Sequence, residues 1–383
     1  MSSNSKHIEI RILEPDEKED ATRNVVLFLA LTVLTAAADI LINQSRNSKD
    51  EKEVKVDYDP AVMVFLIEFI KLGLNFLLLS VCLKDVKRAV EVSKYEIFSN
   101  WVETFKCSVP AFIYVIQNNL SYLALTYLDP GTFEITLQLK LLTTALLMRL
   151  ILDKRLNIYQ WASLTILLIG VCIVESEEFG LFNENFSLKE AKGAEHLLIK
   201  SRLNATSNIL SDQKSGSFNF IKGVLAAVSM TFMSALAGVY FEKLLKETKS
   251  KDSTTISGKN RKGSEATGVN KLWIRNIQMF LFSVPIAFIG IVLKRQDRKS
   301  TDLLEGFDFL AWLVVAAGVS VGLTTSLTLK YLNNIYKNFA SSVSIVLASL
   351  SAMFFAGKDY GINFFIGSTL VFGSLFMYYR SGR

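Results

Sequence analysis

The sequence PGTFEITLQLKLLTTALLMRLIL, residues 130–152, decides the fold class of this chain. It is apolar almost throughout, and as a helix it is long enough to cross the ~30 Å hydrocarbon core of a bilayer. Lys140 lies near its centre, where a cation costs about 3 kcal/mol on insertion scales. Such a lysine usually faces a water-filled cavity or a partner, which indicates a pathway for an anion. A lysine paired with a carboxylate for packing alone is the alternative.

The rest of the chain repeats this pattern of apolar runs. Half of the 383 residues are hydrophobic, 20% are charged, and the mean hydropathy is +0.32. The charges cluster between the apolar runs, which is typical of an all-α polytopic membrane protein. We count ten candidate transmembrane helices, at residues 24–43, 61–83, 105–128, 130–152, 158–175, 220–242, 272–293, 308–330, 335–356 and 361–379.

The basic segments predict the orientation of these spans. The segments 84–94, 153–155 and 246–271 are the most basic and share one side with both termini. The positive-inside rule therefore places the polar tail 1–23 and the C-terminal residues 380–383 in the cytosol. The tail has no apolar core of a cleaved signal peptide.

This orientation assigns two long loops to opposite sides of the membrane. The loop 246–271 is cytosolic and, because it has few apolar residues, is expected to be flexible. The loop 176–219 is lumenal and carries glycosylation triplets that begin at Asn185 and Asn204.

A weak internal repeat divides the chain. LTYLD, residues 125–129, aligns with LKYLN, residues 329–333, at an offset of 204 residues. We therefore predict two five-helix repeats, 24–175 and 220–379, which have opposite orientations because five is odd. Inverted repeats with a central binding site are common in secondary transporters.

Polar residues within the spans are candidates for that site. Asn118 and Asn119 point to different faces of one helix, so at least one is expected to reach the interior; an interhelical hydrogen bond is the alternative. Glu68 and Lys71 lie three residues apart, and they either form a structural pair or open to substrate. Asp39 and Arg149 lie near span ends, where long side chains reach the interface.

The second half supplies further candidates. Lys330 closes the eighth span and precedes an Asn-rich break that includes Asn334; such a break is tolerated where it lines a cavity. Tyr240 either stacks on a ring or belongs to an aromatic belt. Lysines, amides and an aromatic face together suit a phosphorylated ring compound.

Other functions are disfavoured. His7 and His196 fall in polar segments, so an intramembrane enzyme that needs a histidine base is not expected. The three cysteines have no disulfide or metal spacing, and we predict no cofactor and no metal. A net charge of +6 is too small and dispersed to indicate nucleic-acid binding.

Several long stretches resemble the nucleotide-sugar transporters of the drug/metabolite transporter superfamily, in the branch for CMP-sialic acid, UDP-galactose and UDP-N-acetylglucosamine. The resemblance covers roughly residues 25–380. It is carried in order by EFIKLGLNFLLL (68–79), IQNNLSYLALTYLDPGTFEITLQLKLLTTALLMRLILDKRLNIYQWASLTILLIGVCIVE (116–175), AGVYFEKLLK (237–246), LWIRNIQMFLFS (272–283) and LKYLNNIYKNFASSVSIVLAS (329–349).

The resemblance implies which residues bind substrate. Lys140 and Lys330 match lysines that hold the phosphates, Asn118 and Asn119 match paired asparagines, and Tyr240 matches a pocket tyrosine. The chain departs from the pattern at the binding region, where Phe133 and Leu137 replace tyrosines, Glu134 replaces a glutamine and Asn333 replaces an aspartate. The predicted substrate-binding residues are Lys140, Lys330, Asn118, Asn119, Tyr240, Glu68, Lys71, Phe133 and Asn334.

The resemblance also implies a function. The expected activity is antiport of a cytosolic UDP-sugar or CMP-sialic acid for a lumenal nucleoside monophosphate, in the Golgi membrane or alternatively the ER membrane. The expected partners are these nucleotides, membrane lipid, and either a second copy or a glycosyltransferase. A non-transporting scaffold for glycosyltransferases and a transporter of another metabolite are the rival interpretations.

Overall fold

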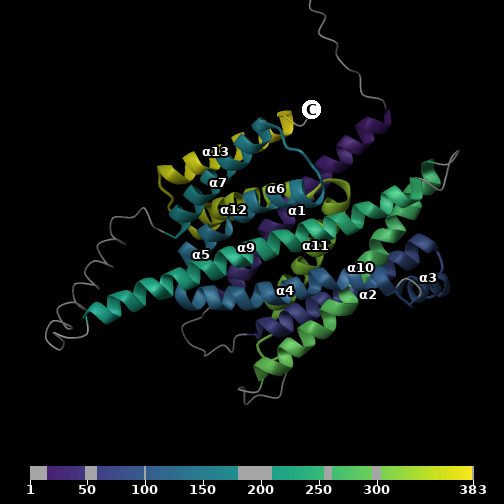
Figure 1. Cartoon of the computed structure of the whole chain (residues 1–383), viewed down its shortest axis with the longest axis horizontal. Coiled ribbons are helices and arrows are strands. Elements are labelled where there is room, and N and C mark those ends of the chain that lie inside the picture. Colours follow the sequence, from purple (N-terminus) through teal and green to yellow (C-terminus); the bar gives the residue numbers. More distant parts are fainter. Residues whose placement is uncertain are drawn as a thin grey trace, which may run out of the picture.

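The computed structural model describes residues 15–47, 58–98, 101–179, 209–253, 261–295 and 303–381 (Figure 1). These residues form helices and no strands. The helices are α1 Pro15–Asn47, α2 Pro60–Leu83, α3 Val86–Phe98, α4 Trp101–Tyr127, α5 Pro130–Leu137, α6 Lys140–Ile151, α7 Ile158–Glu178, α9 Ile209–Ser253, α10 Arg261–Arg295, α11 Phe309–Tyr331, α12 Asn334–Ala356 and α13 Ile362–Ser381.

Eight helices among the described residues are long and apolar enough to cross a membrane. They are α1, α2, α7, α9, α10, α11, α12 and α13. Helix α4 is long enough but carries the polar run Gln117–Asn119, and the predicted fourth span is divided between the short helices α5 and α6. The described part of the chain is all-helical, and its many apolar helices make the protein a multi-pass membrane protein.

Local capping sets several helix ends. Asp59 and Asp129 each accept a hydrogen bond from a backbone N–H of the helix that follows, and a proline then begins that helix. Asp308 caps α11 in the same way, and Asn157 forms a capping box with Gln160 at the start of α7. Side-chain acceptors satisfy N–H groups that have no intrahelical partner, so these turns are encoded locally.

The predicted continuous span 130–152 is wrong in one respect, because the helix is broken in its middle. The N–H groups of Gln138 and Leu139 bond to carbonyls three residues back, at 3.2 and 3.1 Å, instead of continuing the α-helical pattern. Gln138 is buried, and its amide donates to Glu175 of α7 at 3.4 Å. A buried polar contact to a neighbouring helix therefore accompanies the break, and Lys140 becomes the first residue of α6.

Three segments that the sequence presented as polar connections are partly helical. The basic segment 84–94 lies largely within α3. Helix α9 extends to Ser253 and α10 begins at Arg261, so the ends of the predicted loop 246–271 are helical, as their many lysine and glutamate residues favour. Helix α1 begins within the predicted tail, at Pro15. Both glycosylation triplets fall outside the described residues.

Helix boundaries and packing recur at the offset of 204 residues. Helices α4 and α11 end at Tyr127 and Tyr331, α5 and α12 begin at 130 and 334, and α7 and α13 begin at 158 and 362. The most extensive helix pairs are α4–α9, α7–α13, α2–α10 and α1–α11. A shift of 204 residues places α1 on α9 and α4 on α11, so the α1–α11 pair corresponds to the α9–α4 pair. The same shift places α2 on α10 and α7 on α13, so each of these two pairs corresponds to itself. Every one of these pairs joins the two predicted halves.

The α7–α13 pair crosses at two glycines. A Cβ on Gly170 would lie 2.9 Å from the Leu370 Cβ and 3.0 Å from the Gly367 carbonyl oxygen. A Cβ on Gly367 would lie 2.8 Å from the Gly170 carbonyl oxygen. Small residues let helix backbones approach closely in membranes, which is the contact made here.

We expect Gly170→Ala to destabilise the protein by about 1–3 kcal/mol, because the added methyl must push two backbones apart. The matched control is Gly373→Ala in α13, where a Cβ would meet nothing within 4 Å. Thermal unfolding of the purified protein, followed by loss of its monodisperse chromatographic peak, measures both. Equal midpoints for the two variants would show that the crossing is not tightly packed.

Candidate functional site

Lys140 lies at the break between α5 and α6, deep among protein atoms yet partly accessible. Three carboxylates from three other elements interact with its charge: Asp39 of α1, Glu134 of α5 and Glu175 of α7. Glu175 is buried, whereas Asp39 is exposed. The lysine therefore stands within a group of acidic residues rather than alone in an apolar helix.

A second lysine faces this group from the other predicted half. Lys337, in the first turn of α12, interacts electrostatically with both Lys140 and Glu242. Lys337 was not among the predicted site residues, although its charge inside the ninth predicted span was an available signal. Two cations from the two predicted halves thus interact with each other, and a like-charge pair favours a nearby anion.

Glu242 of α9 holds the break between α11 and α12. It is fully buried, and it forms an ion pair with Lys246. Its Oε2 accepts the backbone N–H of Asn334 at 2.7 Å, while Lys246 Nζ donates to the Leu332 carbonyl at 2.8 Å. A buried carboxylate and a lysine from one helix therefore satisfy backbone groups on both sides of the break.

The asparagines at this break fit tightly. Asn333 caps α12 by accepting the Tyr336 N–H at 3.1 Å. Asn334 is buried, and its Oδ1 has no hydrogen-bond partner in the structure. A Cβ on Gly238 would lie 2.5 Å from the Asn334 Nδ2, so α9 needs glycine at this contact.

Lys330 and Tyr240 lie near the same break. Lys330, in the last turn of α11, is only 4% exposed, so it does not extend to the interface as a lysine at a helix end commonly does. Its Nζ lies 5.2 Å from the centroid of the Tyr331 ring. Tyr240 lies on α9, half-buried, two residues before Glu242.

Of the predicted residues of the first half, Phe133 lies in an apolar contact, and the side chains of Asn118 and Asn119 are not described. Phe133 is buried in an apolar cluster between α4, α5 and α9, with Leu137 packed against it; the other buried members are Ala124, Leu128, Ala226 and Ala227. The replacement of tyrosines by Phe133 and Leu137 thus fits a contact that is apolar in this chain. Asn118 and Asn119 lie on α4, and their side chains fall outside the described part of the structure.

Glu68 and Lys71 form an ion pair on α2. Ser283 of α10 donates to the second oxygen of Glu68 at 2.7 Å, and the Lys71 Nζ lies 4.7 Å from the Phe280 ring centroid. Gly322 of α11 leaves room for the lysine, because a Cβ there would lie 2.8 Å from the Lys71 Cδ. The pair is thus held between α2, α10 and α11.

The site suits binding of a polyanion. The described residues contain no group of three or more histidine, cysteine, aspartate or glutamate side chains that could hold a metal ion. Lysine supplies phosphate with a point charge, and the lysines lie where helices from both predicted halves meet.

Comparison with known proteins identifies the family. The family model described as nucleotide-sugar transporter matches residues 20–256 and 261–379. The chain is 32% identical over 355 residues to UDP-galactose/UDP-N-acetylglucosamine transporter srf-3 of Caenorhabditis elegans, covering 92% of this chain and 81% of that protein. It is also 32% identical over 354 residues to the UDP-N-acetylglucosamine transporter of Homo sapiens, covering 92% and 94%.

One further relative and one solved structure also match this chain. The UDP-galactose translocator of Mus musculus is 32% identical over 371 residues, covering 96% of this chain and 81% of that protein. One solved crystal structure superposes with a TM-score of 0.56 at 11% identity, covering 93% of this chain and 96% of that one, which shows a shared fold. Because the family match extends over most of its length, the chain belongs to the nucleotide-sugar transporter family.

Proposed function

We propose that this protein carries UDP-N-acetylglucosamine or UDP-galactose across the Golgi membrane in exchange for a nucleoside monophosphate. The observation that carries the proposal is the electrostatic interaction of Lys140 with Lys337, one lysine from each predicted half. The names of the relatives supply the two sugars, since each of those reported transports UDP-galactose, UDP-N-acetylglucosamine or both. CMP-sialic acid, also expected from the sequence, is a competing substrate to be tested.

The proposed architecture has ten spans in two inverted repeats. Helix α4 and the broken α5–α6 pair join the eight apolar helices to make ten, and α3 is left at the membrane surface. The recurrence of helix ends and helix pairs at one offset supports this division. Alternating access then consists of the two halves rocking about the site between them.

The proposed binding mode follows from the charges. The diphosphate binds Lys140, Lys330 and Lys337, while Asn118, Asn119 and Tyr240 contact the base and sugar. Asp39, Glu134 and Glu175 partly compensate Lys140 when no substrate is bound, because uncompensated buried charge is costly. The substrate's phosphates take over that role. Glu68, Lys71, Phe133 and Asn334 are assigned to shaping the site from its edges.

Reconstituted exchange tests the proposal. Liposomes holding the purified protein are loaded with UMP, CMP or buffer, and uptake of labelled UDP-N-acetylglucosamine, UDP-galactose and CMP-sialic acid is measured side by side. We expect uptake of one or both UDP-sugars that requires internal UMP, because the two nucleotides share the uridine that the pocket recognises. Uptake of CMP-sialic acid with internal CMP would replace the assigned substrate.

The rival interpretation is a membrane scaffold for glycosyltransferases. It predicts that folded protein takes up none of the three labelled substrates from loaded liposomes yet binds an enzyme of sugar transfer. The buried lysines argue against it, since a scaffold has no need for cations that are costly at this depth.

A further inference from the structure

Helix α3, the turn before it and the first turns of α4 carry exposed basic and aromatic side chains. We call this set the α3 surface: its basic members are Lys84, Lys87, Arg88 and Lys94, and its aromatic members are Tyr95, Phe98, Trp101 and Phe105. The aromatic side chains are 64%, 76%, 67% and 61% exposed, respectively. Exposed aromatic rings beside basic side chains are typical of helices that lie in the membrane interface.

The α3 surface is positioned at the end of the transmembrane helices. Lys84 adopts a left-handed conformation, with φ 55°, that ends α2 and turns the chain into α3. Figure 1 shows α3 beside the end of α2, the start of α4 and the side of α10, and it contacts all three. Phe105 packs edge-on against Phe282 of α10 with a centroid distance of 6.4 Å, so the aromatic side chains continue directly onto the lipid-facing surface of the spans.

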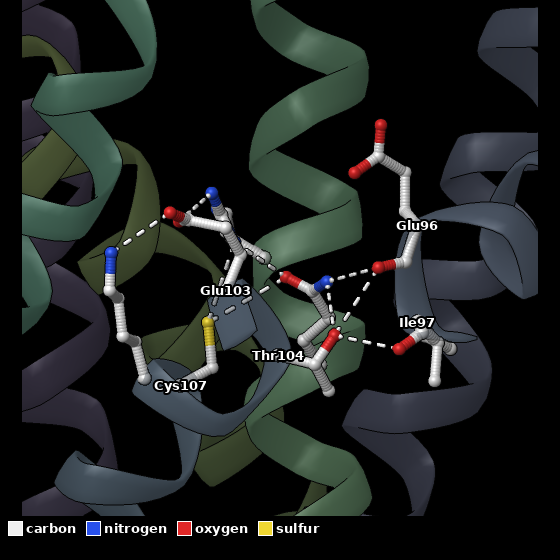
Figure 2. Close-up of polar contacts among 8 residues, drawn as sticks. Glu96, Ile97, Glu103, Thr104 and Cys107 are labelled. Carbon is white, nitrogen blue, oxygen red and sulfur yellow. Dashed lines mark hydrogen bonds and ion pairs between the residues drawn. The ribbon is translucent and has the colours of Figure 1, made fainter. Parts of the chain in front are cut away.

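A polar network fixes α3 in this position (Figure 2). The fully buried Gln278 of α10 donates to the Glu96 carbonyl at 3.2 Å and to the Thr104 hydroxyl at 2.9 Å. The Thr104 hydroxyl in turn bonds to the carbonyls of Glu96 and Ile97, at the C-terminal end of α3. These carbonyls have no partner within their own helix, so the network anchors the end of α3 to α4 and α10.

An ion pair extends the same anchor. Arg275 of α10 contacts Glu103 of α4 at 2.7 Å, and its other nitrogen donates to Gln278 at 3.0 Å. Arg275 thus links the side chains of Glu103 and Gln278. The basic side chains of α3 are exposed, so they can meet another molecule.

The charge of the α3 surface selects its partner. Four exposed basic side chains accompany two exposed acidic ones, Asp85 and Glu91, so the surface has a net positive charge. A protein partner would have to bind across aromatic rings that continue into the lipid-facing surface. A layer of anionic headgroups meets both requirements, because it attracts the lysines and admits the rings at the same depth.

We propose that the α3 surface is a binding site for anionic phospholipid headgroups. It lies outside the substrate site, and the proposal does not depend on the transport function. In the proposed orientation α3 is cytosolic, on the leaflet that carries anionic lipid.

Quenching of Trp101 tests the proposal in the full-length protein. The protein is reconstituted in phosphatidylcholine vesicles that contain a small, equal fraction of either brominated phosphatidylserine or brominated phosphatidylcholine. The signal is the quenching of Trp101, which is the difference in tryptophan quenching between the wild-type protein and Trp101→Phe. We expect at least about twofold more of it with brominated phosphatidylserine, because the basic side chains concentrate the anionic lipid near Trp101.

Charge variants locate the effect. Lys87→Gln, Arg88→Gln and Lys94→Gln combined should remove the excess quenching by brominated phosphatidylserine. The matched control combines Arg149→Gln, Arg155→Gln and Arg380→Gln, three exposed basic residues elsewhere on the protein, and should preserve it. Equal quenching by the two lipids, loss of the excess in the control, or no quenching of Trp101 by either lipid would each overturn the proposal.

Discussion

Lys140→Ala should lower nucleotide-exchange uptake by up to about 100-fold while leaving a folded, monodisperse protein. A hydrogen bond to a charged group is worth up to about 3 kcal/mol, which corresponds to roughly 100-fold in binding. Lys140 is a cation at the helix break of the first predicted half, and it interacts electrostatically with Lys337 of the second. Without it, the phosphates meet Asp39, Glu134 and Glu175, which would repel them.

The measurement is uptake of the labelled UDP-sugar by proteoliposomes that contain equal amounts of each protein. Lys222→Ala is the matched control, since Lys222 is an exposed lysine of α9. It should retain normal uptake. Near-normal uptake by Lys140→Ala would remove Lys140 from the mechanism, whereas an aggregated variant would be replaced by Lys140→Gln, which keeps a polar side chain of similar length.

Glu242→Ala should destabilise the protein by about 3–5 kcal/mol, the cost of leaving a buried ionic partner uncompensated. The substitution removes the acceptor of the Asn334 N–H and the counter-charge of Lys246 together. It should also impair transport, because the break that Glu242 holds lies between Lys330 and Lys337. Thermal unfolding of the purified protein measures the loss.

A graded pair of variants separates the two roles of Glu242. Glu242→Gln keeps an oxygen that can accept from the Asn334 N–H, so it should lose clearly less stability than Glu242→Ala. Glu305→Ala, at an exposed carboxylate, should change the midpoint little. If Glu242→Gln and Glu242→Ala are equally destabilised, the ion pair rather than the backbone contact holds the break. If neither is destabilised, the proposed role of Glu242 is wrong.

Much of the helical framework could be predicted from hydropathy alone. Apolar runs of about 20 residues identify spans because lipid leaves backbone groups no partner outside a helix. The expected ends of the second, eighth and ninth spans lie within two residues of α2, α11 and α12. Family membership was likewise predicted from ordered motifs and is confirmed.

The features that the sequence did not predict have a common physical cause. Each of them depends on a contact between segments that are distant in the sequence. Gln138 resembles an isolated polar residue in an apolar run until Glu175 is placed beside it. The segment of α3 reads as a basic loop until Gln278 anchors its end. Lys337 gains its importance only from its approach to Lys140. The predicted substrate contacts themselves stay predictions.

The pairing of helices across the two halves has a consequence for biosynthesis. Helix α13 is the partner of α7 at the glycine crossing, and it emerges from the ribosome long after α7 is complete. The delay is set by the rate of synthesis, which is about 5–20 residues per second. The same holds for α1 with α11, α2 with α10 and α4 with α9. The first half must therefore wait in the bilayer with its polar and small-residue faces unpaired, exposed to the quality-control machinery. A chain that stops before Ile362 should be recognised as incomplete and degraded, however well its earlier helices have inserted.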